Sequence, residues 1–279
     1  MAIPDSFQYD AVVIGGGPAG LQAALTLGRV HRRTLLLDAG SYRNDPAHHM
    51  HNFLAHDGTP PAELRAAART DLARYDTVTV RDTAAASVGR DGDGFRVVVG
   101  DQEVTSRGLV LATGLRDTLP AVPGLGGLFG DVVAHCPFCH GHELAGTRVA
   151  VLGDPGHVGG LMGPVAASVE GVDPERVVRL ERAADGLRVL FDDGTVEEYG
   201  GMFVATALSQ AAPFAEQLGL AMLPSGCVSV DAMGRTSVAG VHAAGDMAHV
   251  PELPMPMASV LTAAASGLVA GAAMAAYLL

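Results

Sequence analysis

The segment Gly-Gly-Gly-Pro-Ala-Gly at 15–20 constrains what this chain can fold into more than any other. It follows a β-branched apolar run at 10–14 and precedes an apolar stretch of helical period, and a second apolar run follows at 34–38. This order predicts a βαβ unit with parallel strands. The glycines permit a tight turn and a close approach to a pyrophosphate, which the helix N-terminus attracts. The residues expected to contact a dinucleotide here are Gly15, Gly16, Gly17, Pro18, Ala19 and Gly20.

An acidic residue stands where a dinucleotide site needs one. Asp38 ends the second apolar run, 18 residues after Gly20. A carboxylate at the end of the second strand accepts hydrogen bonds from ribose hydroxyls. The glycine pattern alone is weak evidence, but strand, turn, helix and acidic partner together predict a dinucleotide site.

Composition indicates a globular chain and argues against several partners. The 279 residues are 48% apolar and 17% charged, which fits one large domain or two small ones. The formal net charge is −12, and a net-negative surface argues against nucleic acid or an anionic membrane as a partner. Three cysteines are too few for a disulfide framework.

The two ends of the chain bear on its location. The N-terminus lacks the basic and apolar segments of a signal peptide, so we expect a cytoplasmic protein. Residues 260–279 carry no charge and contain Gly267-x-x-x-Gly271, which is compatible with a membrane span. The alanine and glycine content and the absence of flanking cations favour a buried helix instead.

The remaining patterns predict two related α/β modules, the second one shortened. After the first βαβ unit we expect a helix at 61–74, a β-meander at 77–104, a buried strand at 108–112 and a linker at 120–127. A second strand and turn start at 148, and two turn signals predict another meander within 176–206.

The segment His-Cys-Pro-Phe-Cys-His-Gly-His-Glu at 135–143 is the candidate redox centre. Two cysteines at this spacing, Cys136 and Cys139, can close a small disulfide loop and exchange with other thiols. His140 is the candidate acid/base, because an imidazole titrates near neutral pH, and Glu143 is its candidate orienting partner.

Three alternatives to a redox disulfide remain open at this point. Cys-x-x-Cys-His is also the haem c attachment pattern, which requires export, and Cys2His2 zinc ligation is chemically possible. The pair could also be structurally idle. A metal is conceivable for the histidines around His48 and His56 too, but a polar loop explains them equally well and we expect no metal.

Two later segments indicate which dinucleotide binds. Leu-Ala-Thr-Gly at 111–114 ends a buried strand, and a Gly-Asp pair at 245–246 precedes the last helix. With them the sequence resembles the two-dinucleotide-binding-domain flavoproteins. The resemblance implies FAD as cofactor and adds, to the glycine turn and Asp38, contacts by Thr113, Gly114, Gly245 and Asp246.

More narrowly, Cys-Pro-Phe-Cys-His-Gly-x-Glu and His-Asn-Phe-Leu at 51–54 resemble the FAD-dependent dithiol oxidase branch of the thioredoxin reductase-like family. That branch closes disulfides in metabolites of the holomycin, gliotoxin and romidepsin type. The resemblance implies a homodimer, FAD contacts by His51 and Asn52, and a flavin-proximal Cys139. It also implies a Rossmann-like FAD domain at 1–117 and 208–279, with a truncated second α/β domain inserted at 118–207.

The chain departs from a nicotinamide-dependent reductase at 153–176. Pro155 stands where a glycine should let backbone approach a phosphate, and Asp154 adds a negative charge beside it. Only 22 residues separate Gly153 from Arg176, which leaves room for a helix but not for a full second strand and the next crossover. Arg176 and Arg179 are the available 2′-phosphate ligands, yet without an intact cradle we expect no NADPH binding.

Together these features predict an FAD-dependent oxidoreductase that oxidises a small-molecule dithiol, such as a secondary metabolite, through Cys136 and Cys139. Electrons pass to FAD and then to O2, giving H2O2. Two alternatives stay open: a disulfide reductase that uses NADPH or a protein electron donor, and a non-catalytic flavin redox sensor.

Overall fold

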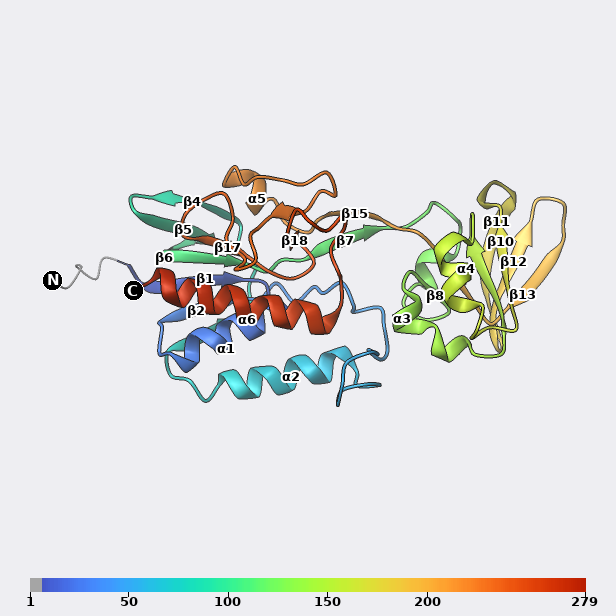
Figure 1. Ribbon diagram of the computed structural model, residues 1–279, viewed down its shortest axis with the longest axis horizontal. Helices are drawn as coiled ribbons and strands as arrows, with labels where there is room; N and C mark the ends of the chain where they lie inside the picture. Colours follow the sequence, from blue (N-terminus) through green and yellow to red (C-terminus); the bar gives the residue numbers. More distant parts are fainter. Residues whose placement is uncertain (1–6) are drawn as a thin grey trace. The chain divides into compact units, whose positions relative to one another are not determined.

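The computed structural model describes residues 7–279, which form two compact units (Figure 1). Unit 1 comprises the described residues up to Arg43 together with Ala62–Arg116 and Ser209–Leu279. Unit 2 comprises Asn44–Pro61 and Asp117–Leu208. The chain changes unit after Arg43, after Pro61, and within strands β7 (Leu115–Thr118) and β15 (Ala207–Gln210), which pair with each other.

The division differs from the sequence expectation in two places. Residues 44–61 were expected in the first domain, whereas in the structure they pack with unit 2. The segment 120–127 was expected to be a linker, whereas Leu125 within it is fully buried in the core of unit 2. Both differences arise from long-range packing, which a local composition shift does not report. Residues 1–6 of the predicted first domain lie outside the described residues.

The main sheet of unit 1 has the strand order β3-β2-β1-β6-β5-β4, with β17 added on β6. Strands β1, β2, β3, β6 and β17 are parallel, and β4 and β5 continue the sheet antiparallel. The bounds are β1 (Tyr9–Ile14), β2 (Thr34–Leu37), β3 (Val78–Arg81), β4 (Ser87–Asp91), β5 (Gly94–Val99), β6 (Gln102–Leu111) and β17 (Val241–Ala243). Smaller elements of unit 1 are α5 (Phe214–Gln217), β16 (Val228–Ser229) and β18 (Ala248–His249).

Both faces of this sheet are covered, which explains the continuous apolar run in β1. Ala11 and Val13 face a core formed with helices α1 (Pro18–Arg29) and α6 (Val260–Tyr277), which lie on the same side of the sheet in Figure 1. Val12 and Ile14 face the opposite core, which includes Phe214 of α5. Helix α2 (Pro61–Leu72) connects β2 to β3.

Helices α1 and α6 pack closely through the glycines of the Gly-x-x-x-Gly pattern. A Cβ atom on Gly267 would lie 2.1 Å from the carbonyl oxygen of Ala19, and one on Gly271 would lie 2.9 Å from that of Ala23. The pattern therefore serves a contact between two helices of unit 1.

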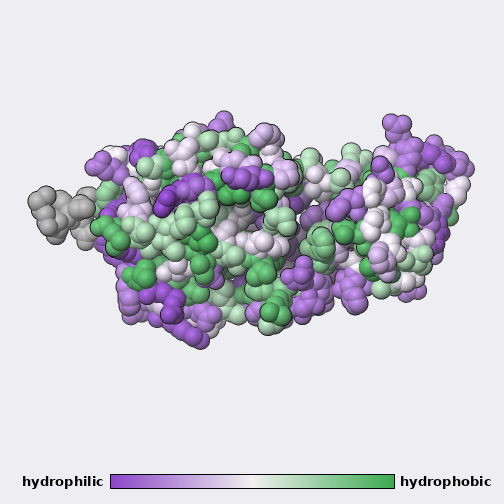
Figure 2. All heavy atoms as spheres, in the orientation of Figure 1, coloured by the Kyte–Doolittle hydropathy of each residue, from purple (hydrophilic) through white to green (hydrophobic). Residues whose placement is uncertain are grey.

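Helix α6 is long and apolar enough to cross a bilayer by length and composition, a test that core helices of soluble proteins also pass. Its outer face exposes Leu261, Leu268 and Tyr277, and Figure 2 shows pale and green surface over this helix. The inner face packs on α1, as expected for the buried alternative.

The predicted meander at 77–104 is only partly present. Strand β3 pairs parallel with β2 because α2 returns the chain to the same end of the sheet, so the antiparallel part starts at β4. The strand predicted at 108–112 is the second half of β6, one continuous strand whose first half pairs with β5 and whose second half pairs with β1.

Unit 2 contains a parallel sheet of order β10-β9-β14-β8 and an antiparallel sheet of order β11-β12-β13. The strand bounds are β8 (Val133–Ala134), β9 (Arg148–Leu152), β10 (Ser168–Val172), β11 (Val177–Ala183), β12 (Gly186–Phe191), β13 (Val196–Tyr199) and β14 (Gly201–Phe203). The helices are α3 (Pro137–His140) and α4 (Gly156–Met162), with 3-10 turns η1 (Leu125–Gly127), η2 (His142–Leu144) and η3 (Pro174–Arg176).

The expectation that a second parallel strand does not fit after residue 153 is wrong. The seven-residue helix α4 leads into β10, which pairs parallel with β9 over five residues. A short helix suffices for this crossover because the strands are themselves short. No α-helix separates β10 from the meander, because η3 leads directly into β11. The predicted meander is present as β11–β13, whereas β14, within the predicted range 176–206, joins the parallel sheet.

We expect Gly267→Ala to destabilise the protein by about 2 kcal/mol, because the added methyl group meets the backbone of α1 and forces the helices apart. Thermal unfolding followed by far-UV circular dichroism measures this effect. Gly89→Ala is the matched control, since a Cβ atom there has no neighbour within 4 Å. Equal stability of the two variants would show that α1 and α6 do not depend on this contact.

His242 predicts a pH dependence of stability. Its side chain is 2% exposed, neither ring nitrogen has a hydrogen-bond partner among the described residues, and burial lowers its pKa to about 4. The unfolded chain takes up this proton near pH 6.5, so stability falls between pH 6.5 and 4, by roughly 3 kcal/mol in total. Urea unfolding of His242→Leu should lose this slope, whereas the exposed control His48→Gln should keep it.

Candidate redox and dinucleotide sites

The glycine turn of unit 1 depends on the absence of side chains. Gly15 has φ +119°, and a Cβ atom on it would lie 2.2 Å from the carbonyl oxygen of Ala112 at the end of β6. A Cβ atom on Gly20 would lie 1.8 Å from the carbonyl oxygen of Gly15. Only glycine allows these backbones to meet, as the sequence predicted for a tight strand-turn-helix connection.

The N-terminus of α1 is open. Gly17 is its N-cap, no side chain caps it, and a Cβ atom on Gly17 would meet nothing within 4 Å. Pro18 occupies the first helical turn, where its missing N–H costs nothing. An uncapped twelve-residue helix with free space at its N-terminus fits a pyrophosphate.

Asp38 is buried at the end of β2 within a set of hydrogen-bond donors. Its carboxylate accepts from the Gly40 N–H at 2.9 Å, from the Tyr42 hydroxyl at 2.5 Å and from the Arg69 guanidinium. Burial raises the pKa of Asp38, but these hydrogen bonds outweigh it and lower the pKa overall. A carboxylate accepts about four hydrogen bonds, so one position remains for a ribose hydroxyl.

The later glycine segments reach the same region of unit 1. A Cβ atom on Gly15 would lie 3.1 Å from the N atom of Thr113, and one on Gly245 would lie 3.0 Å from Cβ of Ala19. Asp246 pairs with Arg43, with 2.9 Å between Oδ2 and Nη1. The structure therefore gathers the glycine turn, Thr113 and the Gly245–Asp246 pair, and this arrangement fits a dinucleotide.

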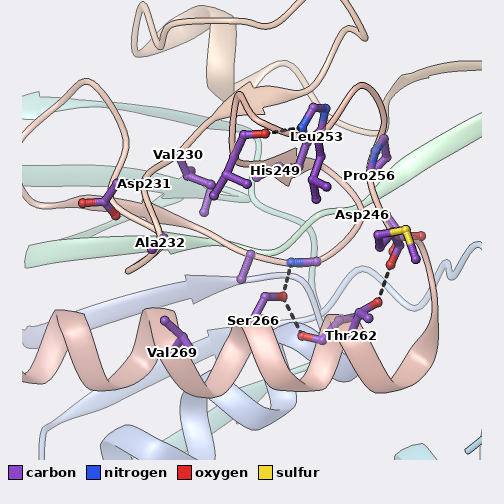
Figure 3. Close-up of a pocket in the computed structure, with 18 residues that line it drawn as sticks. Val230, Asp231, Ala232, Asp246, His249, Leu253, Pro256, Thr262, Ser266 and Val269 are labelled. Atoms are coloured by element: carbon purple, nitrogen blue, oxygen red, sulfur yellow. Dashed lines mark hydrogen bonds between the residues drawn. The ribbon is translucent and has the colours of Figure 1, made fainter.

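A cavity of about 210 Å³ adjoins Asp246, between the first half of α6 and the loops that precede it (Figure 3). On its wall Ser266 accepts a hydrogen bond from the Gly245 N–H at 2.9 Å. The N-cap residue Ser259 accepts one from the Thr262 N–H at 3.0 Å, at the start of the same helix. These hydroxyls anchor the Gly245–Asp246 turn and the start of α6.

The candidate redox centre lies in unit 2, directly after β8. Cys136 is the N-cap of α3, and its carbonyl oxygen accepts from the N–H groups of Cys139 and His140. This single turn brings the two Sγ atoms to 2.9 Å from each other. Gly141 follows the turn as the C-cap of α3. Glycine is required there because a Cβ atom would lie 2.4 Å from the carbonyl oxygen of Pro137 and 2.9 Å from Sδ of Met162 on α4.

The surroundings of His140 favour the neutral imidazole. Burial lowers the pKa of His140, against a hydrogen bond to the backbone of Gly130 and the negative charge of Glu143, which raise it. Its Nδ1 atom is buried and has no hydrogen-bond partner within residues 7–279. A neutral imidazole with an available nitrogen can accept a proton from a thiol.

His51 and Asn52, expected as FAD contacts, lie in the segment 44–61 of unit 2. His51 stands between two carboxylates: Nδ1 is 3.6 Å from Oδ2 of Asp57, and Nε2 is 3.5 Å from Oε1 of Glu143. The backbone N–H of Asn52 donates to Asp57 at 2.7 Å. No group of three or more potential ligands is placed to hold a metal ion in the described part of the chain.

The second strand-turn-helix, in unit 2, differs from the first at the same position. The Gly156 N–H, at the start of α4, donates to Oδ1 of Asp154 at 3.0 Å. Arg176 pairs with Asp193 at 2.5 Å, and Arg179 pairs with Glu181. The helix start is thus occupied by a carboxylate, and both candidate phosphate ligands are paired within the meander.

Sequence reasoning missed the cations that hold the acidic residues of unit 1. Arg69 lies on α2 and contacts both Asp38 and Asp82, and Arg43 contacts Asp246. The guanidinium of Arg65 lies 3.8 Å from the ring centroid of Tyr42. No local motif marks these residues, because the partners Arg43 and Asp246 are 203 positions apart.

Comparisons with known proteins agree with this arrangement. The family model for pyridine nucleotide-disulphide oxidoreductases matches residues 9–172 and 166–267. Thioredoxin reductase sirT of Leptosphaeria maculans is 33% identical over 94% of this chain and 92% of its own length. Among solved structures, an oxidoreductase from Agrobacterium tumefaciens is 31% identical with a TM-score of 0.85, covering 96% of this chain and 97% of its own. HlmI is 31% identical with a TM-score of 0.86, covering 97% of this chain and 92% of its own.

Gly17→Ala tests whether the space at the start of α1 is a ligand site. The added methyl group meets no protein atom, so we expect the melting temperature of the apoprotein to stay unchanged. The same methyl group enters the phosphate position and should weaken FAD binding by roughly 100-fold, the loss expected when steric contact removes a few hydrogen bonds to an anion. Fluorescence titration of apoprotein with FAD measures the affinity, and unchanged affinity would contradict this assignment.

Proposed function

The chain belongs to the pyridine nucleotide-disulphide oxidoreductase family, and from this premise we propose that it is an FAD-dependent oxidase of small-molecule dithiols. It is a thioredoxin reductase-like flavoprotein oxidoreductase, and its cofactor is FAD. The proposal concerns the direction of electron flow and the substrate.

The observation that carries the proposal is the contrast between the two strand-turn-helix connections. The first leaves the N-terminus of α1 open, whereas in the second Asp154 accepts from the Gly156 N–H and Pro155 removes a donor. A nicotinamide dinucleotide would need that second helix start for its pyrophosphate. This contrast supports a thiol, rather than a nicotinamide, as the source of electrons for the cysteine pair.

The redox reaction balances with dioxygen as the second substrate. FAD, when bound, accepts the electron pair and passes it to dioxygen, so that a dithiol and O2 give a disulfide and H2O2. One substrate thiolate attacks the disulfide of Cys136 and Cys139 at Cys136, forming a mixed disulfide and leaving Cys139 as a thiolate. The second substrate thiolate attacks the substrate sulfur of that mixed disulfide, which releases the oxidised product and a Cys136 thiolate.

His140 supplies the proton transfer in this scheme. Each substrate thiol must lose a proton before its sulfur attacks, since the thiolate is the nucleophile. The buried Nδ1 atom of His140, one residue beyond Cys139, is available to accept that proton. The neutral state that burial favours is the state a base requires.

Two exposed apolar side chains of unit 2 support an apolar substrate. Phe138, between the two cysteines, is 63% exposed, and Leu54 in the segment 44–61 of the same unit is 90% exposed. An apolar ligand that contacted these side chains would remove their surface from water. This setting supports a hydrophobic secondary metabolite that carries two thiols.

The names of the relatives favour a second candidate function, the reduction of a protein disulfide. That function requires NADPH or a protein electron donor, as in a thioredoxin reductase. Anaerobic flavin absorbance separates the two functions, with NADPH, NADH and dithiothreitol added to separate samples of the holoprotein. We expect bleaching by the dithiol only, with recovery in air and formation of H2O2, whereas rapid bleaching by NADPH would overturn the oxidase proposal.

The cysteine pair is tested by single substitutions. Cys136→Ser and Cys139→Ser should each retain FAD and lose dithiol oxidation by at least about 1000-fold, the scale seen when a catalytic nucleophile is removed. Oxygen uptake with dithiothreitol measures turnover. Cys227→Ala is the cysteine-matched control, since Cys227 is fully buried in unit 1 and should leave turnover intact. Turnover in either serine variant would rule out the scheme.

A further inference from the structure

The segment 44–61, hereafter the 44–61 loop, forms a closed structure within unit 2. The Met50 N–H donates to the Thr59 carbonyl at 3.0 Å, and the Gly58 N–H donates to the Met50 carbonyl at 2.9 Å. Met50 itself is buried. At the tip, Asn52 and Ala55 adopt positive φ values of 61° and 68°, conformations that cost energy for residues other than glycine. The loop is therefore held in one shape.

This loop contacts two residues of unit 2 that act on His140, Gly130 and Glu143. Gly130, whose backbone is hydrogen-bonded to the His140 ring, has its Cα facing Pro46, where a Cβ atom would lie 2.5 Å from Cβ of Pro46. The second contact is the ion pair between His51 and Glu143 on η2. The loop is thus in contact with the two groups that raise the pKa of His140.

His51 lies between the carboxylates of Asp57 and Glu143, and its effect on His140 is opposite to that of Glu143. Glu143 favours the protonated form of His140, and His51 opposes it. His51 faces both Glu143 and Asp57, so the carboxylate that acts on His140 lies against His51 while Nδ1 of His140 has no hydrogen-bond partner among residues 7–279. Asp57 is 69% exposed and anchored by the Asn52 N–H, so it holds the other side of His51.

We propose that His51 is a positioning residue: it holds the Glu143 carboxylate away from His140 and so keeps the His140 imidazole neutral and able to accept a thiol proton. This role rests on the proposed dithiol oxidation, and it is separate from the FAD contact that family resemblance implies for His51. The proton moves from the attacking thiol to His140 and then to water, while the electron pair stays on sulfur.

Other groups close to His140 are part of the same balance. Cys139 precedes His140 on α3 and Cys136 is the N-cap of that helix, while Glu143 and His51 act on His140 from η2 and from the 44–61 loop. Helix α4 also packs on α3 and places the uncharged Met162 against Gly141. His142 acts on Asp57, the outer partner of His51.

The direct test measures the protonation of His140 without turnover. Protein labelled with 13C at histidine Cε1 is titrated by NMR, with the His140 signal identified by its loss in His140→Gln. In His51→Gln the titration of His140 should move to higher pH, and in Glu143→Gln it should move to lower pH. The double variant should fall between the two single variants. His49→Gln is the control, an exposed histidine of the same loop.

Kinetics provide the second readout. The acid limb of the pH profile of kcat/KM should move to higher pH in His51→Gln. At pH 6 the value should fall by roughly tenfold, a part of the 10²–10⁴-fold that a general base contributes. Glu143→Gln added to His51→Gln should restore most of this loss. A uniform loss at every pH would show a merely structural role and overturn the proposal.

The outcomes separate this inference from the proposed function. If the wild type does not oxidise dithiols but the His140 titration moves as expected, the oxidase function fails and the positioning of Glu143 stands. If dithiols are oxidised but the titration is the same in His51→Gln and the wild type, the inference on His51 fails. Should His51→Gln not fold, Asp57→Asn provides a second variant, because it weakens the contact that holds Nδ1 of His51. An unchanged His140 titration in Asp57→Asn also contradicts the inference.

Discussion

The convergence of backbones at a few glycines is the constraint on which unit 1 depends. The end of β6, the turn before α1 and helix α6 approach so closely that Cβ atoms on Gly15, Gly20 or Gly267 would overlap carbonyl oxygens. This packing places the start of α1 against the Gly245–Asp246 turn while leaving it uncapped. The candidate dinucleotide site follows from how the sheet and the two helices meet, since Gly17, between the contact glycines Gly15 and Gly20, has open space at the uncapped start of α1.

Unit 2 repeats this topology with a different helix start. Strand β9, helix α4 and strand β10 repeat the arrangement of strand, turn, helix and parallel strand. The difference is local, because a carboxylate, Asp154, already accepts the N–H that a phosphate would need, and Pro155 has none to offer. What remains is a scaffold: its sheet presents the cysteine segment, and α4 supports it through the contact between Met162 and Gly141.

The electrostatics of the two sites follow different rules. In unit 1 the buried carboxylate of Asp38 is kept ionised by Tyr42 and Arg69, which makes it a rigid acceptor for a polar ligand. In unit 2 the influences on His140 oppose one another: burial and His51 lower its pKa, Gly130 and Glu143 raise it, and burial decides that the pKa is lowered overall. Opposing influences on the pKa suit a group that gains and loses protons, whereas strong hydrogen bonds suit a group that only binds a ligand.

The sequence by itself determined the features that depend on neighbouring residues: the glycine turn before α1, the acidic end of β2, the spacing of Cys136 and Cys139, and Pro155 at the start of α4. These are properties of backbone freedom and of short chain separation, which a sequence displays directly. Only the tertiary structure decided that β3 pairs parallel with β2, that the 44–61 loop packs with unit 2, that Arg69 holds Asp38, and that His51 holds Glu143. Such contacts join residues distant in the chain, and the packing of whole elements selects them rather than any local preference.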